Sequence, residues 1–190
     1  VGSGVSTQYM LNALQMNRDR DGRPYCFDAI EPYPSEKLLD LNASQDIALH
    51  PAPVQEVSRA LFDQLSVNDI LFIDSTHVGK VESDVYTLLL DVLPGLAAGT
   101  IVHLHDITLP YLTLPAGHPL ADLSILCNES ALVKALLSSN DSFRMLMCQS
   151  LLHEQQPAAL QSLVPAYDPS RHFPTSLWLQ KTRDVNSACS

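Results

Sequence analysis

Short apolar runs alternate with segments of helical spacing along most of the chain. Apolar runs that end at polar residues or prolines predict strands, and apolar residues three or four positions apart predict helices. The predicted strands are residues 25–30, 45–50, 69–74, 100–105, 143–148 and 176–180, and the predicted helices are residues 6–16, 35–41, 54–65, 83–93 and 128–138. This alternation is typical of an α/β fold with a mostly parallel sheet covered by helices.

Two of these segments allow more detailed predictions. The run Asp69-Ile-Leu-Phe-Ile-Asp74 is unbroken and apolar, as expected for a central parallel strand that is buried on both faces. In the helix over residues 6–16, the spacing puts four apolar side chains on the inner face: Tyr9, Met10, Leu14 and Met16.

The ends of the chain differ from its middle. The opening Val1-Gly2-Ser3-Gly4 is typical of the end of a strand that enters a tight loop. Since a strand needs about five residues, we expect the chain to begin inside its first strand. The length suits one domain over residues 1–183, followed by a loose tail over residues 184–190.

Composition narrows the function classes. The formal charge is -10, from 21 acidic and 11 basic residues, and the basic residues are scattered. An acidic surface repels phosphate backbones, which argues against a nucleic-acid partner. The sequence has neither an apolar run of about 20 residues nor a signal-peptide pattern, so no membrane is expected. Cysteines without regular pairing favour reduced thiols and a cytoplasmic location. The oligomeric state stays open, a homo-oligomer included.

The candidate chemistry follows the predicted strands. Ligands of open parallel sheets bind beyond the carboxyl ends of the strands, where this chain has Gly2-Ser3-Gly4, Glu31, Asp74-Ser-Thr-His77 and His105-Asp106. Glycines let the backbone turn tightly and approach a ligand closely. A carboxylate such as Glu31 can accept hydrogen bonds from both hydroxyls of a ribose. The alternative for Glu31 is a solvated acid at a strand end.

Asp74 and Asp106 are candidate metal ligands because each ends an apolar strand. Together with His105 they form an oxygen and nitrogen set suited to Mg²⁺ or Mn²⁺. Successive strand residues point to opposite faces, so His105 and Asp106 converge only if the strand has already turned. The alternative is structural: Asp74 caps a turn and Asp106 contacts a backbone amide.

Three histidines lie near these strand ends. His103 is deeper in its strand, where a packed core residue is expected. His77 and His105 are at the rim and are candidate general bases near physiological pH.

Several segments together resemble a family of class I S-adenosylmethionine-dependent methyltransferase domains. The segments are Val1-Gly-Ser-Gly-Val-Ser-Thr7, Ile30-Glu-Pro-Tyr-Pro34, Asp69 to Val78, Ser83-Asp-Val85, Leu93-Pro94 and Gly99 to Ile107, with Asn128-Glu129 before the late helix. The blocks Phe-Ile-Asp-Ser-Thr-His and Val-His-Leu-His-Asp-Ile are specific, whereas the glycine turn is not. The likeness extends from residue 1 to about Trp178.

The resemblance implies a Rossmann-like, doubly wound sheet of seven strands and S-adenosylmethionine as cofactor. It places Gly2, Ser3 and Gly4 against the methionine part, Glu31 on the ribose, and residues 53–55, Gln55 included, near the adenine. Asp74 lies beside the methionine end and the acceptor. In related metal-dependent O-methyltransferases, acidic residues at the same strand ends hold a divalent cation, and Asp74, His105 and Asp106 fall on those positions.

The expected reaction is methylation of a small-molecule hydroxyl, with Asp74, His77 and His105 as catalytic residues. Methyl transfer from a sulfonium needs donor and acceptor held in line, and a hydroxyl must also lose its proton. The loop over residues 108–118 is expected to form a wall of the acceptor pocket. Two alternatives stay open: an NAD-dependent or nucleotide-sugar enzyme of Rossmann type, and a non-catalytic binding domain.

Overall fold

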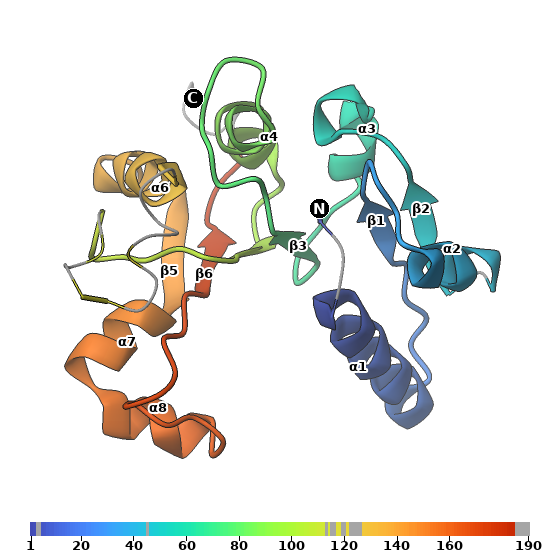
Figure 1. The fold of residues 1–190 in the computed structure, drawn as a ribbon. Coiled ribbons are helices and arrows are strands. Elements are labelled where there is room, and N and C mark those ends of the chain that lie inside the picture. The colour runs from blue at the N-terminus through green and yellow to red at the C-terminus, as the bar shows by residue number, and fades with distance from the viewer. Residues whose placement is uncertain are drawn as a thin grey trace. The chain divides into compact units, whose positions relative to one another are not determined.

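The computed structural model describes residues 1–2, 5–44, 46–112, 114, 117–118, 121 and 127–184 (Figure 1). The chain divides into two compact units, Val1–Val57 and Ser58–Ser190, which we call unit 1 and unit 2. Asp184, the first residue of the expected tail, accepts a hydrogen bond from the Ala98 backbone (2.7 Å), and residues 185–190 lie outside the described part.

Unit 1 consists of two short parallel strands with helices around them. Its elements are α1 (Val5–Asp21), β1 (Asp28–Ile30), α2 (Glu36–Ala43), β2 (Ala48–His50) and the 3-10 turn η1 (Val54–Glu56). The strands pair in parallel with Ile30 opposite His50. The core contains Leu11, Ala29, Leu38 and Ile47. Ser35 caps α2, because its side chain accepts the Leu38 N–H.

The first helix differs from its prediction in length and face. α1 continues through the charged segment to Asp21, where Arg18 and Arg20 in the last turn suit the negative end of the helix dipole. The next residue, Gly22, has a φ of 68°, which is the left-handed conformation of a C-terminal cap. The predicted inner face is wrong for Tyr9 and Met16, which are more than two-thirds exposed, whereas Met10 and Leu14 are half-buried. The buried residues of α1 are Thr7 and Leu11.

Unit 2 contains a four-stranded sheet in the order β3-β4-β6-β5. Its elements are α3 (Arg59–Phe62), β3 (Ile70–Ile73), α4 (Asp84–Tyr86), η2 (Thr87–Val92), η3 (Leu93–Gly95), β4 (Ile101–Leu104), α6 (Glu129–Ser138), β5 (Phe143–Cys148), α7 (Gln149–Gln155), α8 (Pro157–Leu163) and β6 (Leu177–Lys181). β3 and β4 are parallel, and β6 runs antiparallel to both β4 and β5. The expected single sheet of seven strands is not found within the described residues. They form instead the two-stranded sheet of unit 1 and the four-stranded sheet of unit 2.

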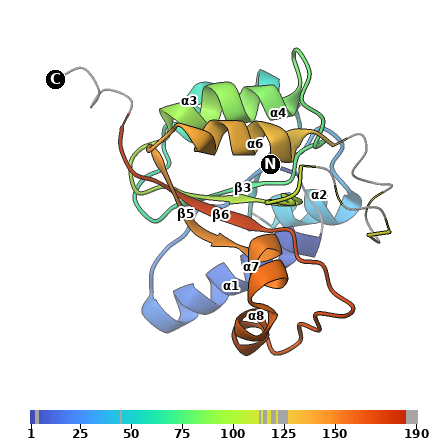
Figure 2. The same ribbon diagram turned by 90° about the vertical axis from the view of Figure 1, so that its left-hand side faces the viewer.

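Helices cover both sides of the sheet of unit 2. In Figures 1 and 2, α4 and α6 lie on one side of the strands, and α7 and α8 on the other. The strand residues Val102, Leu104, Leu177 and Leu179 are fully buried. The sequence pattern did not predict α7 and α8. Among the described residues, no helix combines the length and apolar character that crossing a membrane requires.

His103 is a packed residue of β4, as predicted. Its ring stacks on Trp178 with 4.0 Å between centroids and meets the Phe72 ring edge-on at 4.9 Å. Its Nε2 is buried and has no hydrogen-bond partner among the described residues. Burial lowers the pKa of His103 to about 4, because a charged ring would lose its hydration.

We therefore expect His103 to make unfolding easier in acid. The unfolded chain takes up a proton near pH 6.5 and the folded chain only near pH 4, so this part of the stability is complete above pH 6.5 and is lost as the pH falls towards 4. His103→Phe keeps an aromatic ring and removes the titration. When the pH is lowered from 7 to 5, the unfolding free energy of the His103→Phe variant should fall by about 1 kcal/mol less than that of the wild type. This value is discounted for the partial solvent exposure of the ring. Urea unfolding at both pH values measures this difference, and equal losses would contradict it.

Candidate functional site

The parallel pairing of β3 and β4 brings the predicted chemistry to one edge of the sheet in unit 2. Ile73 lies opposite Leu104, so Asp74 and His105 follow the strands at the same level. The His105 backbone N–H donates to Ile73 O (2.9 Å), which continues the ladder by one step. At Asp106 the chain turns with a φ of 56°. This is the turn that His105 and Asp106 need in order to lie on the same side.

Asp74, His77, His105 and Asp106 form one cluster, which we call the strand-end cluster. Nε2 of His77 is 3.6 Å from Asp74 Oδ1 and 3.5 Å from Asp106 Oδ2. Nδ1 of His105 is 3.5 Å from Asp74 Oδ1 and 3.3 Å from Asp106 Oδ1. These distances are longer than those of the best hydrogen bonds.

A buried carboxylate supports this cluster from α6. Glu129 is 1% exposed, and its Oε2 accepts from His77 Nδ1 (2.8 Å) and from Ser75 Oγ (2.9 Å). A carboxylate only accepts hydrogen bonds, so an ionised Glu129 pairs with the form of His77 that carries its proton on Nδ1. In a neutral His77 the lone pair is then on Nε2, which faces Asp74 and Asp106.

The charges of the cluster separate the roles of its two histidines. Asp106, and after it Asp74, raise the pKa of His105 to about 10, and His105 in turn lowers the pKa of Asp106 to about 2. His105 therefore keeps its proton at neutral pH and offers a positive charge. The hydrogen bond to Glu129 raises the pKa of His77. Of the two predicted bases, His77 is the better placed, because Nδ1 is held by Glu129 and Nε2 makes no hydrogen bond to the described residues.

The same cluster offers donors for a cation. Asp74, His77 and Asp106 each present one ligand atom, and these atoms lie within 4.8 Å of one another. Oxygen and imidazole donors suit Mg²⁺ or Mn²⁺. The bond from His77 Nδ1 to a buried carboxylate is the usual support of a metal-binding histidine. The donor set thus fits a divalent cation, with His77 in the place that the sequence assigned to His105.

The predicted cofactor residues lie in unit 1. Gly2 has a φ of 83°, which favours glycine, and its N–H donates to Ile30 O (3.0 Å). This places Gly2 at the end of β1, next to Glu31, whose Oε1 accepts the Tyr33 N–H (3.0 Å). Gln55 is exposed on η1, after β2. Ser3 and Gly4 lie outside the described residues.

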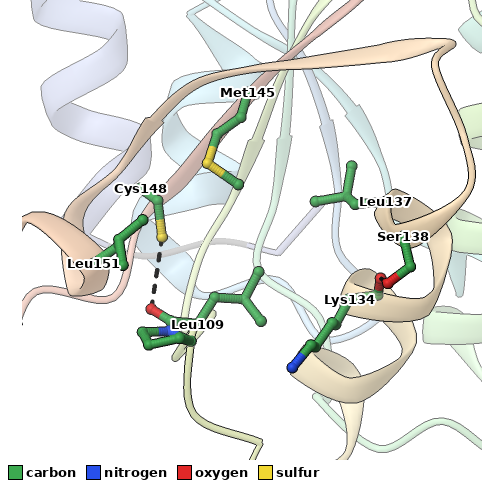
Figure 3. A pocket seen from close by; sticks show the side chains of 8 residues that line it. Leu109, Lys134, Leu137, Ser138, Met145, Cys148 and Leu151 are labelled. Carbon is green, nitrogen blue, oxygen red and sulfur yellow. Dashed lines mark hydrogen bonds between the residues drawn. The ribbon is translucent and has the colours of Figure 1, made fainter.

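An apolar cavity of about 310 Å³ opens in unit 2 beside the loop that follows β4. Figure 3 shows Leu109 on one side, Leu137 and Lys134 of α6 opposite, and Met145 and Cys148 of β5 nearby. The Cys148 thiol donates to Leu109 O (3.7 Å). Leu109 follows Asp106 by three residues, so their Cα atoms are at most about 11 Å apart.

Sequence reasoning did not assign a role to Glu129 or to Thr175, whose Oγ1 donates to Asp106 Oδ1 (2.8 Å). In the sequence Glu129 is an acid in the first turn of a helix, where acids are common. Thr175 is a polar residue before the last strand. Glu129 and Thr175 are recognised as parts of the site only through their contacts with His77 and Asp106, which lie far away in the chain.

A family model described as "Methyltransferase domain" matches residues 1–107, more than half of the chain. The crystal structure of the plantazolicin methyltransferase BpumL, in complex with a triazolic desmethylPZN analog and SAH, is similar with a TM-score of 0.51 and 15% identity. The likeness covers 95% of this chain and 73% of that one, and it confirms the Rossmann-like α/β class. No curated protein matches the chain.

Proposed function

This chain belongs to the methyltransferase domain family, and from that premise we propose that it transfers the methyl group of S-adenosylmethionine to a hydroxyl of a small molecule. The resemblance noted in the sequence is thereby confirmed at the level of the family. Membership also decides against an NAD-dependent or nucleotide-sugar enzyme. The similar plantazolicin methyltransferase was solved with SAH, the product that S-adenosylmethionine leaves, which supports the choice of methyl donor.

The observation that favours a hydroxyl acceptor is the position of His77 in the strand-end cluster. Its Nε2 is oriented by a buried carboxylate and faces two further carboxylates at 3.5 and 3.6 Å. His77 and Asp106 both have left-handed backbones, with φ of 60° and 56°. Such strain in residues other than glycine is common where side-chain placement serves a function. A base held in this way is needed for a hydroxyl, whereas a thiolate or a free amine can attack a sulfonium without one.

In the proposed reaction Nε2 of His77 takes the proton of the acceptor hydroxyl. The oxygen attacks the methyl carbon, a new C–O bond forms, and the C–S bond breaks with its electron pair moving to sulfur. The products are the methyl ether, S-adenosylhomocysteine and a protonated His77. Asp74 and Asp106 stabilise the imidazolium that forms, and His105 offsets part of their charge.

The cofactor is assigned to residues of unit 1. We propose that Glu31 accepts hydrogen bonds from the ribose hydroxyls and that Gly2, with Ser3 and Gly4, contacts the methionine part. Gln55 is proposed near the adenine. Glu31 Oε1 also accepts the Tyr33 N–H (3.0 Å), which fixes the carboxylate at the turn after β1.

The apolar cavity is the proposed site for the hydrophobic part of the acceptor. Its volume of about 310 Å³ is at the lower end of small-molecule sites. Leu109 and Pro110 belong to the loop after β4 and line the cavity. Their position supports the prediction that this loop forms a wall of the acceptor pocket.

A divalent cation is a second way to activate the hydroxyl, favoured by the donor set of Asp74, His77 and Asp106. When bound there, Mg²⁺ or Mn²⁺ would lower the pKa of the acceptor hydroxyl. His77 Nε2 cannot be a metal ligand and a base at the same time, so the two mechanisms are separable by experiment.

The test is transfer of a labelled methyl group from S-adenosylmethionine to a panel of phenols, sugars and aliphatic alcohols, with amines of similar shape as controls. Each reaction is run in EDTA and again with added Mg²⁺ or Mn²⁺. We expect methyl ethers from at least one hydroxyl class, formed in EDTA at an undiminished rate because His77 supplies the base.

Other outcomes decide between the alternatives. A rate that falls at least about 10-fold in EDTA and returns with the cation would replace the base mechanism by the cation mechanism. Methylation of amines alone would contradict the hydroxyl proposal. Tight binding of S-adenosylmethionine with no turnover on any acceptor would identify a non-catalytic binding domain.

A further inference from the structure

The loop that carries His77 is held by two consecutive residues from a distant part of the chain, Asn128 and Glu129. This loop comprises residues 75–79, and we call it the His77 loop. Asn128 and Glu129 are at the start of α6, about 50 residues downstream. Because the His77 backbone is left-handed (φ 60°), an imidazole-bearing residue stays there only if its surroundings fix the loop.

Asn128 holds the backbone of the His77 loop. Its own N–H donates to His77 O (3.1 Å). Its side-chain oxygen accepts the Gly79 N–H (2.5 Å), and its side-chain NH₂ donates to Gly79 O (3.1 Å). A Cβ added at Gly79 would clash with Cδ1 of Leu132 and lie 3.1 Å from Asn128 Oδ1, so a larger residue fits only if the Leu132 side chain moves. The loop backbone and the start of α6 therefore pack as one piece.

Glu129 holds the side chains of the same loop. One oxygen, Oε2, accepts hydrogen bonds from Ser75 Oγ and from His77 Nδ1. Ser75 Oγ in turn accepts a hydrogen bond from the backbone N–H of His77 (3.1 Å). The other oxygen, Oε1, is buried and has no hydrogen-bond partner among the described residues. An apolar or amide side chain would fill this position at a lower free-energy cost of desolvation than a buried carboxylate. The negative charge is thus explained by what it does to His77 and not by packing.

We propose that Glu129 is a positioning residue, which keeps the proton of neutral His77 on Nδ1 and so leaves the lone pair of Nε2 facing Asp74 and Asp106. Asn128 fixes the loop in which this pairing forms. Free histidine divides its proton between both nitrogens, so without Glu129 a part of the population would carry the proton on Nε2 and offer no acceptor there. The effect on methyl transfer rests on the proposed function, whereas the position of the proton does not.

The experiment compares the wild type with Glu129→Gln and, as matched control, with Glu154→Gln, which changes an exposed glutamate on α7 in the same way. Long-range ¹H–¹⁵N NMR spectra of the neutral imidazole report which nitrogen carries the proton. We expect the Nδ1–H form in the wild type and in the control, and a mixture with the Nε2–H form in Glu129→Gln. Methyl transfer should fall about 10- to 100-fold in kcat, with the KM of the acceptor nearly unchanged.

Several outcomes would overturn the proposal. A wild-type His77 with its proton on Nε2 would do so without any variant, which keeps the test valid if Glu129→Gln does not fold. A Glu129→Gln protein with an unchanged Nδ1–H form would do so as well. A shifted tautomer supports the positioning role whatever the turnover, and unchanged turnover in that variant would instead contradict the proposed role of His77 as the base.

Discussion

Replacing His77 by asparagine is expected to lower kcat for methyl transfer by about 10²- to 10⁴-fold, the usual contribution of a general base. Asparagine is the appropriate replacement because it tolerates the left-handed backbone that His77 adopts. It therefore removes the imidazole while leaving the loop in place. The affinity for S-adenosylhomocysteine should stay within about two-fold, because His77 is assigned to the acceptor proton and not to the cofactor.

The measurement is kcat and KM with the best acceptor of the hydroxyl panel, together with calorimetry for the cofactor. His172→Gln is the control, since His172 is exposed and lies outside the strand-end cluster. His105→Gln should have the smaller effect of the two cluster variants, because a ring with a pKa of about 10 keeps its proton at neutral pH. A larger loss in His105→Gln than in His77→Asn would reverse the roles assigned to these histidines.

Replacing Glu31 by alanine is expected to weaken binding of S-adenosylmethionine and S-adenosylhomocysteine by about 100-fold or more. Each hydrogen bond from a ribose hydroxyl to a carboxylate contributes about 1.5–3 kcal/mol, and the proposal gives Glu31 two of them. The Glu31 carboxylate also accepts the Tyr33 N–H, so part of the effect can pass through the turn at residues 31–33.

Calorimetry on the wild type and two variants separates these contributions. Glu36→Ala removes another, exposed carboxylate of unit 1 and should leave the affinity unchanged. Glu31→Gln keeps an oxygen for the Tyr33 N–H and loses the charge, so an intermediate loss is expected. Equal affinity of Glu31→Ala and the wild type, with both proteins folded by circular dichroism, would return Glu31 to the alternative of a solvated acid at a strand end.

The alternation of apolar runs and helical spacing was sufficient for much of the fold. β5 agrees with its predicted residues 143–148, and β3 and β4 lie inside their predicted ranges. Local chemistry also sets the helix caps, since Ser35 and Ser83 accept backbone N–H groups at the starts of α2 and α4. These features depend on residues close together in the sequence, which is why the sequence reveals them.

The pattern of apolar and polar residues was less informative where an element depends on contacts with residues distant in the sequence. The predicted helix over residues 54–65 is interrupted and forms η1 and α3. The predicted inner face of α1 was wrong at Tyr9 and Met16, because apolar side chains at helical spacing do not indicate which neighbours are available to cover them. Likewise, β6 runs antiparallel beside β4, and strand direction within a sheet is a property of the whole topology.

By itself, the sequence determined the α/β class, the family, and the identity of the residues at the strand ends, Asp74, His77, His105 and Asp106 among them. These follow from local order along the chain. The tertiary structure decided how those residues are used, because the left-handed turn at Asp106 and the parallel register of β3 and β4 set the distances in the cluster. It also added Glu129, a residue 52 positions from His77, whose role exists only through a contact that no local pattern encodes.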